Sequence, residues 1–162
     1  MKKCVFAGSF DPFTVGHADV VQKSLRIFDE VIIAVGRNTA KRCMFSAEER
    51  LEMVSSVYAN EPRVKIVLWE GVIVDLLQRE GTPFYVRGIR SGRDFEYEQF
   101  DAYASHDLDP DMLTVFLPCE QQHLHLSSSL VRNCIAFHKS FESYVPQEVF
   151  AYIERKGCLQ KN

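Results

Sequence analysis

The chain has 162 residues, of which 46% are hydrophobic and 25% charged, and its formal net charge is −3 at pH 7. This length predicts one domain with a substantial core, residues 1–162, and is too short for two ordinary domains. The acidic balance excludes a general attraction to nucleic acid or to an anionic membrane surface. No apolar run has transmembrane length, and five scattered cysteines without a C-x-x-C pair argue against a disulfide framework and a structural zinc site. We therefore expect a cytoplasmic protein without nucleic-acid or membrane partners.

The first motif joins a short apolar strand to the start of a helix over residues 4–17, CVFAGSFDPFTVGH. Gly8 lets the backbone leave the strand and lets a ligand come close, and Gly16 does the same where the helix begins. The first turn of a helix has unpaired N–H groups and a partial positive charge. An anion held between Gly8 and His17 would meet these donors. The motif predicts a phosphate-handling enzyme.

Strand-like and helical patterns alternate through the rest of the chain. Ser46 and Glu49 form a capping box at the start of one of the helical patterns. This alternation predicts an α/β fold: a single Rossmann-like domain with a five-stranded parallel sheet, right-handed crossovers and helices on both faces. The expected strands are 4–7, 30–35, 64–68, 84–86 and 113–117, and the expected helices are 17–28, 46–58, 72–78, 94–108, 126–137 and 146–156.

Four of the five expected strands deliver groups that suit phosphate chemistry to their carboxyl ends, where ligands of such sheets bind. These groups are Ser9 with the T-x-G-H turn that ends at His17, the loop with Lys41, the segment 87–90 (RGIR), and the serines 127–129. Each has an ordinary explanation alone, because serines often only cap helices and arginines often only face solvent. At successive strand ends they together indicate a phosphate site.

Three blocks of the sequence resemble the bacterial phosphopantetheine adenylyltransferases, which belong to the nucleotidyltransferases with the H/T-x-G-H motif. The blocks are residues 8–17 (GSFDPFTVGH), 87–98 (RGIRSGRDFEYE) and 127–132 (SSSLVR). They occur in the same order and at matching spacing, and the resemblance covers nearly the whole chain. T-x-G-H alone indicates only the superfamily, whose other members act on different phosphorylated acceptors. The two later blocks narrow the resemblance to this family, and it implies the nucleotidyltransferase fold.

The resemblance implies transfer of the adenylyl group of ATP to phosphopantetheine, which gives dephospho-coenzyme A and pyrophosphate in the penultimate step of coenzyme A biosynthesis. It also implies Mg²⁺ as cofactor, a homohexamer, and coenzyme A as a feedback inhibitor. The chemistry suits the residue types. The attacking group is a phosphate with a second pKa near 6, so no general base is required, and what remains is positioning and stabilisation of charge.

The resemblance also implies residue roles. His17 would stabilise the α-phosphate of ATP, and Lys41 and Arg90 would complete the catalytic set. Lys41 is favoured over its neighbour Arg42 by the resemblance alone. The implied acceptor site is Ser9, Lys41, Ile73 and Arg87. The implied ATP site is Ser9, Phe10, His17, Gly88, Ile89, Arg90, Glu98, His123, Leu124, His125, Leu126, Ser127, Ser128 and Ser129. No metal ligand is expected on the protein.

The segment from His123 to His125 departs from the family pattern, which has an aromatic, a small residue and a second aromatic there. Either the two imidazoles contact the adenine, or the loop packs differently. Two other functions stay open: a nucleotide-binding module without catalysis, and a sister enzyme with another phosphorylated acceptor. His17, Lys41 and Arg90 together favour an enzyme, because a binding module has no need of donors on both sides of the α-phosphate.

Overall fold

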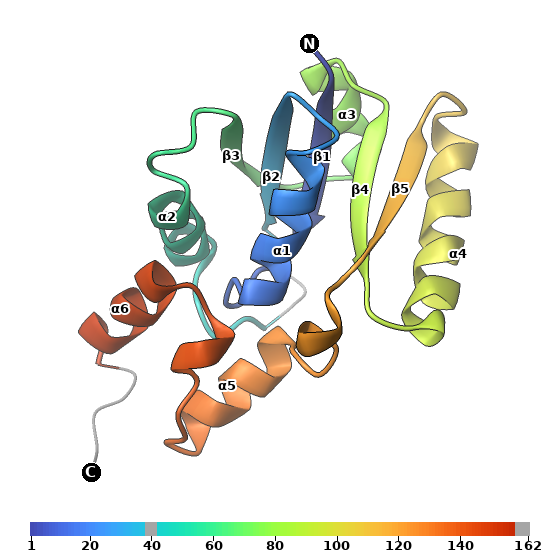
Figure 1. Cartoon of the computed structure of the whole chain (residues 1–162). Coiled ribbons are helices and arrows are strands. Elements are labelled where there is room, and N and C mark those ends of the chain that lie inside the picture. Colours follow the sequence, from blue (N-terminus) through green and yellow to red (C-terminus); the bar gives the residue numbers. More distant parts are fainter. Residues whose placement is uncertain (38–41, 158–162) are drawn as a thin grey trace.

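The computed structural model describes residues 1–37 and 42–157 (Figure 1). Within these residues, five parallel strands form one sheet in the order β3-β2-β1-β4-β5, which confirms the predicted α/β fold. The strands are β1 Lys3–Gly8, β2 Glu30–Gly36, β3 Val64–Trp69, β4 Phe84–Ile89 and β5 Leu113–Pro118. The helices are α1 Val15–Ser24, α2 Ala47–Val57, α3 Ile73–Glu80, α4 Gly92–Leu108, α5 Ser128–Ala136 and α6 Gln147–Arg155, with single 3₁₀ turns at η1 Gln121–His123 and η2 Glu142–Tyr144.

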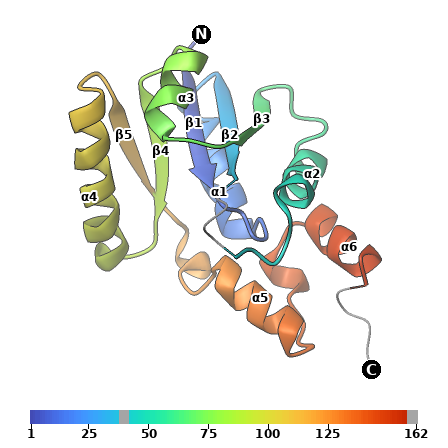
Figure 2. The ribbon, with the colours of Figure 1, turned by 180° about the vertical axis from the view of Figure 1, so that it is seen from behind.

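Helices cover both faces of the sheet. On one face α1, α2, α5 and α6 share the larger apolar core with alternate residues of β1 and β2, such as Phe6 and Ile33. On the other face α3 packs on the remaining alternate residues, such as Val5 and Ile32, and Figure 2 shows it in front of the strands. β2 is buried on both sides, as its β-branched sequence predicts. Within the described residues, no helix is long and apolar enough to cross a membrane.

The strand order places a topological switch point between β1 and β4. The chain adds β2 and β3 on one side of β1, then returns to add β4 and β5 on the other side. Crossovers therefore leave β1 and β4 in opposite directions, and a crevice opens beyond the carboxyl ends of these two strands. This crevice is where a doubly wound sheet binds its ligands.

Several predicted boundaries were wrong by a few residues. β4 continues to Ile89, where Arg87 to Ile89 pair with Phe116 to Pro118 of β5. Gly88 and the polar Arg87 interrupt the apolar run, which hides this end of the strand from the pattern. α1 begins before His17 because Thr14 caps it, and α5 begins after Leu126 because Ser127 is its N-cap. The predicted capping box of α2 is confirmed on both of its bonds.

Candidate active site

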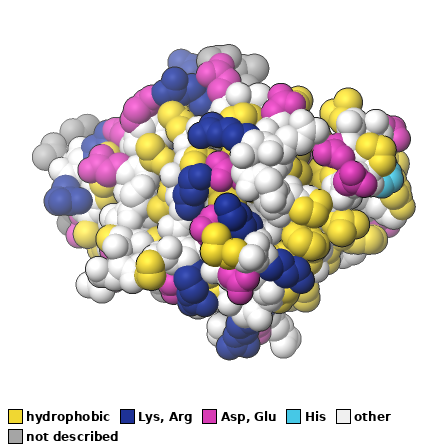
Figure 3. Space-filling model, turned by 90° about the horizontal axis from the view of Figure 1, so that it is seen from above, with side chains coloured by type: hydrophobic (Ala, Val, Ile, Leu, Met, Phe, Trp, Pro, Cys, Tyr) yellow, Lys and Arg dark blue, Asp and Glu magenta, His cyan; other side chains and the backbone are white. Residues whose placement is uncertain are grey.

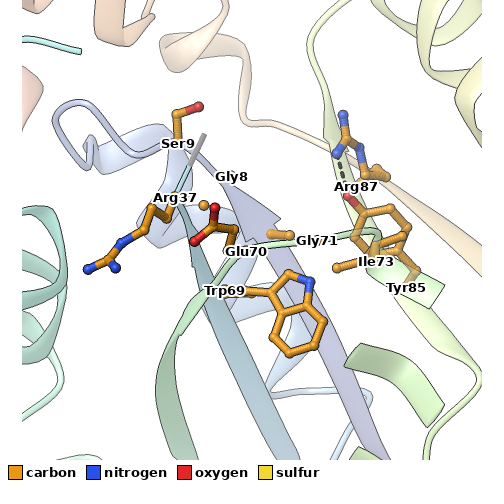
Figure 4. A pocket seen from close by; sticks show the side chains of 12 residues that line it. Gly8, Ser9, Arg37, Trp69, Glu70, Gly71, Ile73, Tyr85 and Arg87 are labelled. Atoms are coloured by element: carbon orange, nitrogen blue, oxygen red, sulfur yellow. Dashed lines mark hydrogen bonds between the residues drawn. The ribbon is translucent and has the colours of Figure 1, made fainter. Parts of the chain in front are cut away.

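Two cavities open at the carboxyl ends of β1 and β4, and they share a wall made of residues 7–9 and Arg87. The α1-side cavity has about 400 Å³ and lies among the N-terminal ends of α1 and α5 and the end of β4. The α3-side cavity has about 430 Å³ and lies between β3, β4 and the start of α3 (Figure 4). Ligands in the two cavities would therefore meet at the shared wall.

His17 lies in the first turn of α1 and lines the α1-side cavity. It forms a capping box with Thr14, in which the Thr14 backbone N–H donates to His17 Nδ1 at 3.0 Å and the His17 backbone N–H donates to Thr14 Oγ1 at 3.3 Å. Because Nδ1 accepts a hydrogen bond, the proton of the neutral ring lies on Nε2. The capping interaction thus fixes both the orientation and the tautomer of this histidine.

Three aromatic rings surround His17, with ring centroids of Phe6, Phe10 and Phe13 at 6.4, 5.0 and 5.4 Å. Burial removes the water that would stabilise an imidazolium ion, and the charge of Arg90 opposes it further. Together they lower the pKa of His17 to about 4. At neutral pH this side chain is an uncharged hydrogen-bond donor at Nε2.

The loop between β1 and α1 is held by two buried charged residues that the sequence analysis missed. The Arg50 guanidinium donates to the carbonyl groups of Ser9 and Gly36, and to that of Phe45 at 3.2 Å. The Asp11 carboxylate accepts from the backbone N–H of Phe45 at 2.9 Å. A signal for Arg50 existed, since helical spacing places it on the face that buries Met53 and Val54.

A cation and a helix N-terminus lie side by side in the α1-side cavity. Arg90 donates to the Leu126 carbonyl at 2.7 Å and pairs with Asp94 at 3.0 Å. Ser127 caps α5 by accepting from the Leu130 N–H at 3.1 Å, and the Ser128 hydroxyl donates to the Pro12 carbonyl at 2.8 Å. The serines thus have the capping and packing roles of ordinary helix starts. The cavity they line, with Arg90 beside it, suits an anion.

Arg87 lies in the wall between the cavities and forms an ion pair with Glu98 of α4 and a hydrogen bond with the Tyr85 hydroxyl (Figure 4). Glu98 lines the α1-side cavity as part of this pair. Gly88 lines it as well, although its missing side chain has a packing reason. A Cβ there would lie 2.7 Å from Cγ2 of Val20, so the glycine lets α1 pack on β4.

The α3-side cavity has apolar walls and a polar rim. Of the predicted residues, Ser9, Ile73 and Arg87 line it. Gly8, which the sequence analysis named as a place where a ligand can come close, lines it as well, whereas the other lining residues were missed, namely Arg37, Trp69, Glu70, Gly71 and Tyr85, with Ala7, Ala34 and Gly36. Figure 4 shows Ile73 next to the Tyr85 ring and the Trp69 indole near Gly71. Trp69 ends β3, at the edge of the sheet where ligands bind, but an indole does not suit phosphate chemistry, so the search for phosphate groups at strand ends passed over it.

The predicted ATP residues divide into two groups by position. Those that line the α1-side cavity are Ser9, Phe10, His17, Gly88, Arg90, Glu98, His123, Leu126, Ser127 and Ser128. Among the described residues, Ile89, Leu124, His125 and Ser129 are not part of its lining. Lys41 lies outside the described residues.

The two histidines of the unusual segment have different surroundings. His125 packs edge-on against Tyr144, with ring centroids 6.0 Å apart. His123 lines the α1-side cavity, and its Nδ1 is buried without a hydrogen-bond partner among the described residues. A buried nitrogen without a hydrogen-bond partner lowers the stability of the folded state. Of the two histidines, His123 is therefore the one whose ring would be stabilised by a further hydrogen bond.

A doubly wound parallel sheet with a neutral histidine, an arginine and a helix N-terminus at its switch point defines a nucleotidyltransferase-type protein. Residues 5–134 match the model of the family described as cytidylyltransferase-like. Relatives named phosphopantetheine adenylyltransferase cover almost the whole chain. That of Porphyromonas gingivalis is 47% identical over 149 residues, which are 91% of this chain and 97% of the relative.

The relative from Campylobacter jejuni is 36% identical over 156 residues, 96% of this chain and 99% of its own length. The relative from Christiangramia forsetii is 38% identical over 149 residues, 92% and 98% of the two chains. The chain belongs to the phosphopantetheine adenylyltransferase family.

Proposed function

We propose that this chain transfers the adenylyl group of ATP to phosphopantetheine, giving dephospho-coenzyme A and pyrophosphate. The observation that carries this proposal is the pair of cavities that share residues 7–9 and Arg87. Direct transfer requires two bound substrates whose reacting phosphates touch. Two separate pockets with one common wall meet this requirement, and the names of the relatives supply the substrates.

ATP suits the α1-side cavity. Arg90 and the first turn of α5 would hold the β- and γ-phosphates, because both favour negative charge. The Nε2–H of His17 would meet the α-phosphate. His123 would contact the adenine, because it lines this cavity at the end away from Arg87 that the loop before α5 forms.

Phosphopantetheine suits the α3-side cavity. Its uncharged arm would lie along the walls formed by Trp69, Ile73 and Tyr85, where apolar surface is removed from water. Its phosphate would lie at the shared wall, between Ser9 and the Arg87 guanidinium. Lys41, if it reaches this phosphate, would add a second cation.

The reaction in this geometry is an in-line displacement. A phosphate oxygen of phosphopantetheine forms a bond to the α-phosphorus while the bond from that phosphorus to the bridging oxygen breaks, and pyrophosphate leaves with the electron pair. The attacking phosphate is already largely dianionic at neutral pH, so no residue has to remove a proton. His17 stabilises charge that develops on the α-phosphate, and Arg90 stabilises charge on the leaving group.

The expected Mg²⁺ would bind mainly through the phosphates of the substrate. Within the described part of the chain, no group of three or more His, Cys, Asp or Glu side chains could hold a metal ion. The carboxylates beside the α1-side cavity, Asp94 and Glu98, are paired with Arg90 and Arg87. Mg²⁺ commonly binds substrate phosphates and keeps several waters. The ion would therefore arrive with ATP, and the residue roles above do not depend on it.

Self-association, as a homohexamer, is part of the same proposal. Helix α4 buries none of its residues within the chain, and its Phe95, Tyr97, Phe100 and Tyr103 are exposed. Figure 3 shows hydrophobic side chains gathered on the side of the molecule that carries α4. Such an aromatic face suits an interface between subunits. Light scattering on the purified protein tests it, and a monomer would contradict it.

Two finer points belong to the proposal. Coenzyme A contains both the pantetheine arm and the adenylyl group of the product, so it suits both cavities and would inhibit by occupying them. We also infer a cytoplasmic location, because ATP and phosphopantetheine are intracellular metabolites.

The decisive experiment measures pyrophosphate release from ATP and Mg²⁺ with and without phosphopantetheine, and identifies the second product. Release that requires phosphopantetheine, with dephospho-coenzyme A as product, is the expected result. Release only with another phosphorylated acceptor would indicate a sister enzyme. ATP binding without release, whatever the acceptor, would indicate a binding module.

A further inference from the structure

Lys23, in the last turn of α1, joins that helix to the segment that follows β5. Its ammonium donates to the Pro118 carbonyl at 2.6 Å, and it pairs with Asp19 and Glu120 at 2.9 Å each. The Asp19 carboxylate also accepts the backbone N–H of Glu120 at 3.2 Å. All three donors of the ammonium therefore have an acceptor, and the four residues form a closed network.

The segment held in this way is residues 119–126, here named the nucleotide loop, which carries His123 and leads into α5. The loop has bonds of its own, from the His123 N–H to the Glu120 carbonyl at 2.8 Å and from the Leu126 N–H to the His123 carbonyl at 3.0 Å. Its far end is held by Arg90, which donates to the Leu126 carbonyl at 2.7 Å. The loop is thus anchored at both ends, with His123 between the anchors.

The two anchors differ in one respect that matters for a test. Arg90 lines the α1-side cavity, so its loss would remove a phosphate contact and an anchor together. Lys23 is not one of the described residues that line either cavity. An effect of Lys23 on the nucleotide would therefore have to act through the loop.

We propose that Lys23 is a positioning residue for the nucleotide: it holds the loop of residues 119–126 in the geometry that ATP requires before ATP binds. Binding then does not have to order the loop, and this saving appears as affinity for ATP. The proposal rests on the proposed function, which places ATP in the α1-side cavity. Partly exposed ion pairs contribute little to folding, so the effect belongs to binding more than to stability.

The test compares initial rates of pyrophosphate release by Lys23→Met and wild-type protein, with each substrate varied in turn. We expect the KM for ATP to rise by about threefold to tenfold, while kcat and the KM for phosphopantetheine stay within about twofold. Lys23→Arg should restore the wild-type KM, because a guanidinium can donate to the same three acceptors. Lys3→Met is the matched control. It removes the single pair with Glu30, at 3.9 Å, from the opposite end of β1 and should change none of these values.

An unchanged KM for ATP in Lys23→Met would overturn the proposal, and so would an equal rise of both KM values, which indicates a general loss of structure. If Lys23→Met does not fold, Glu120→Ala removes one acceptor of the same link at an exposed side chain and must give a selective rise in the KM for ATP. An inactive wild-type protein would refute the proposed function instead. The role of Lys23 would then be tested by calorimetric titration with ATP. The titration must still show weaker ATP binding by Lys23→Met than by the wild type.

Discussion

The two cavities that meet at Arg87 are built in different ways. In the α1-side cavity the polar groups are held by other protein groups: His17 by Thr14, and Arg90 by Asp94 and the Leu126 carbonyl. The α3-side cavity adds to the shared Arg87 the flat walls of Trp69 and Tyr85 and the apolar side chain of Ile73. Fixed donors are needed where charge develops, whereas an uncharged arm needs mainly a surface to cover. The contrast predicts that changes on the α1 side lower kcat and changes on the α3 side raise the KM for the acceptor.

The largest effect is expected for His17→Ala. Removing one preorganised donor from the site of developing charge lowers kcat by about 100-fold to 1,000-fold, as for an oxyanion-hole donor. ATP affinity, measured by calorimetry, should change by less than about threefold, because the neutral donor acts mainly in the transition state.

Thr14→Ser is the control for this variant, since it keeps the hydroxyl and the backbone N–H that orient His17 and should keep nearly full activity. A His17→Ala protein that turns over near the wild-type rate would remove His17 from the mechanism. It would also contradict the statement that the fixed donors of the α1-side cavity determine kcat.

The next effect separates Arg90, which lines the α1-side cavity alone, from Arg87, three residues before it, which lies in the wall that the two cavities share. Each would make charge-assisted hydrogen bonds worth about 1.5 to 3 kcal/mol, or about 10-fold to 100-fold. We expect Arg90→Met to lower kcat as well as to raise the KM for ATP, and Arg87→Met to raise the KM for phosphopantetheine. Steady-state kinetics with each substrate varied measures both.

Loss of Arg87 also leaves the Glu98 carboxylate without its partner, so Arg87→Met is compared with the double variant Arg87→Met, Glu98→Gln. The acceptor KM should stay high in both variants. If Arg87→Met raised the KM for ATP and the KM for phosphopantetheine by the same factor, Arg87 would not act on the acceptor as proposed.

The same contrast explains what could be predicted from the sequence. The α1-side residues fall within short motifs, so Ser9, His17 and Arg90 were found together. The residues that line only the α3 side come singly from the ends of β2, β3 and β4 and from the start of α3, and among them only Ile73 was named, through the family resemblance. A pocket formed by single residues from several strands has no local pattern, and its composition depends on the strand order.

The fold was more predictable than the support of the site. The alternation of strands and helices follows from local periodicity, and the Ser46 capping box is a local signal. The support that Asp11 and Arg50 give to the loop after β1 joins residues more than thirty positions apart. The packing role of Gly88 was not predicted either. This glycine was read as a nucleotide contact, and the structure gives it a packing role against Val20 as well.

Gly88→Ala should therefore destabilise the protein. The new Cβ would lie 2.7 Å from Val20 Cγ2, and overpacking of this kind costs about 1 to 3 kcal/mol. Chemical denaturation measures the loss. In a Val20→Ala background the same substitution should cost less, because the clashing methyl is gone. Gly92→Ala is the control, since a Cβ there has no described atom within 4 Å. Equal losses for the two glycines would contradict the packing role.

The smallest effect is the pH dependence of the stability, which His17 should govern because it is a neutral buried group. Burial and Arg90 lower the pKa of His17 to about 4 in the folded protein, against about 6.5 in the unfolded chain. Between these values the unfolded state binds a proton at His17 and the folded state does not, so stability falls as the pH decreases below about 6.5. From pH 6.5 to 5.5 this loss is about 1 kcal/mol.

His17→Gln keeps a neutral polar side chain but cannot titrate, so the wild type should lose about 1 kcal/mol more than this variant over the same interval. Denaturation curves at pH 6.5 and 5.5 measure the difference. The activity should follow another group. Its acid limb should lie near pH 6, where the acceptor phosphate gains a proton, because His17 is still neutral there. A stability difference of zero would mean that His17 is not buried as a neutral donor, and the α1-side cavity would then lack the fixed group on which the contrast rests.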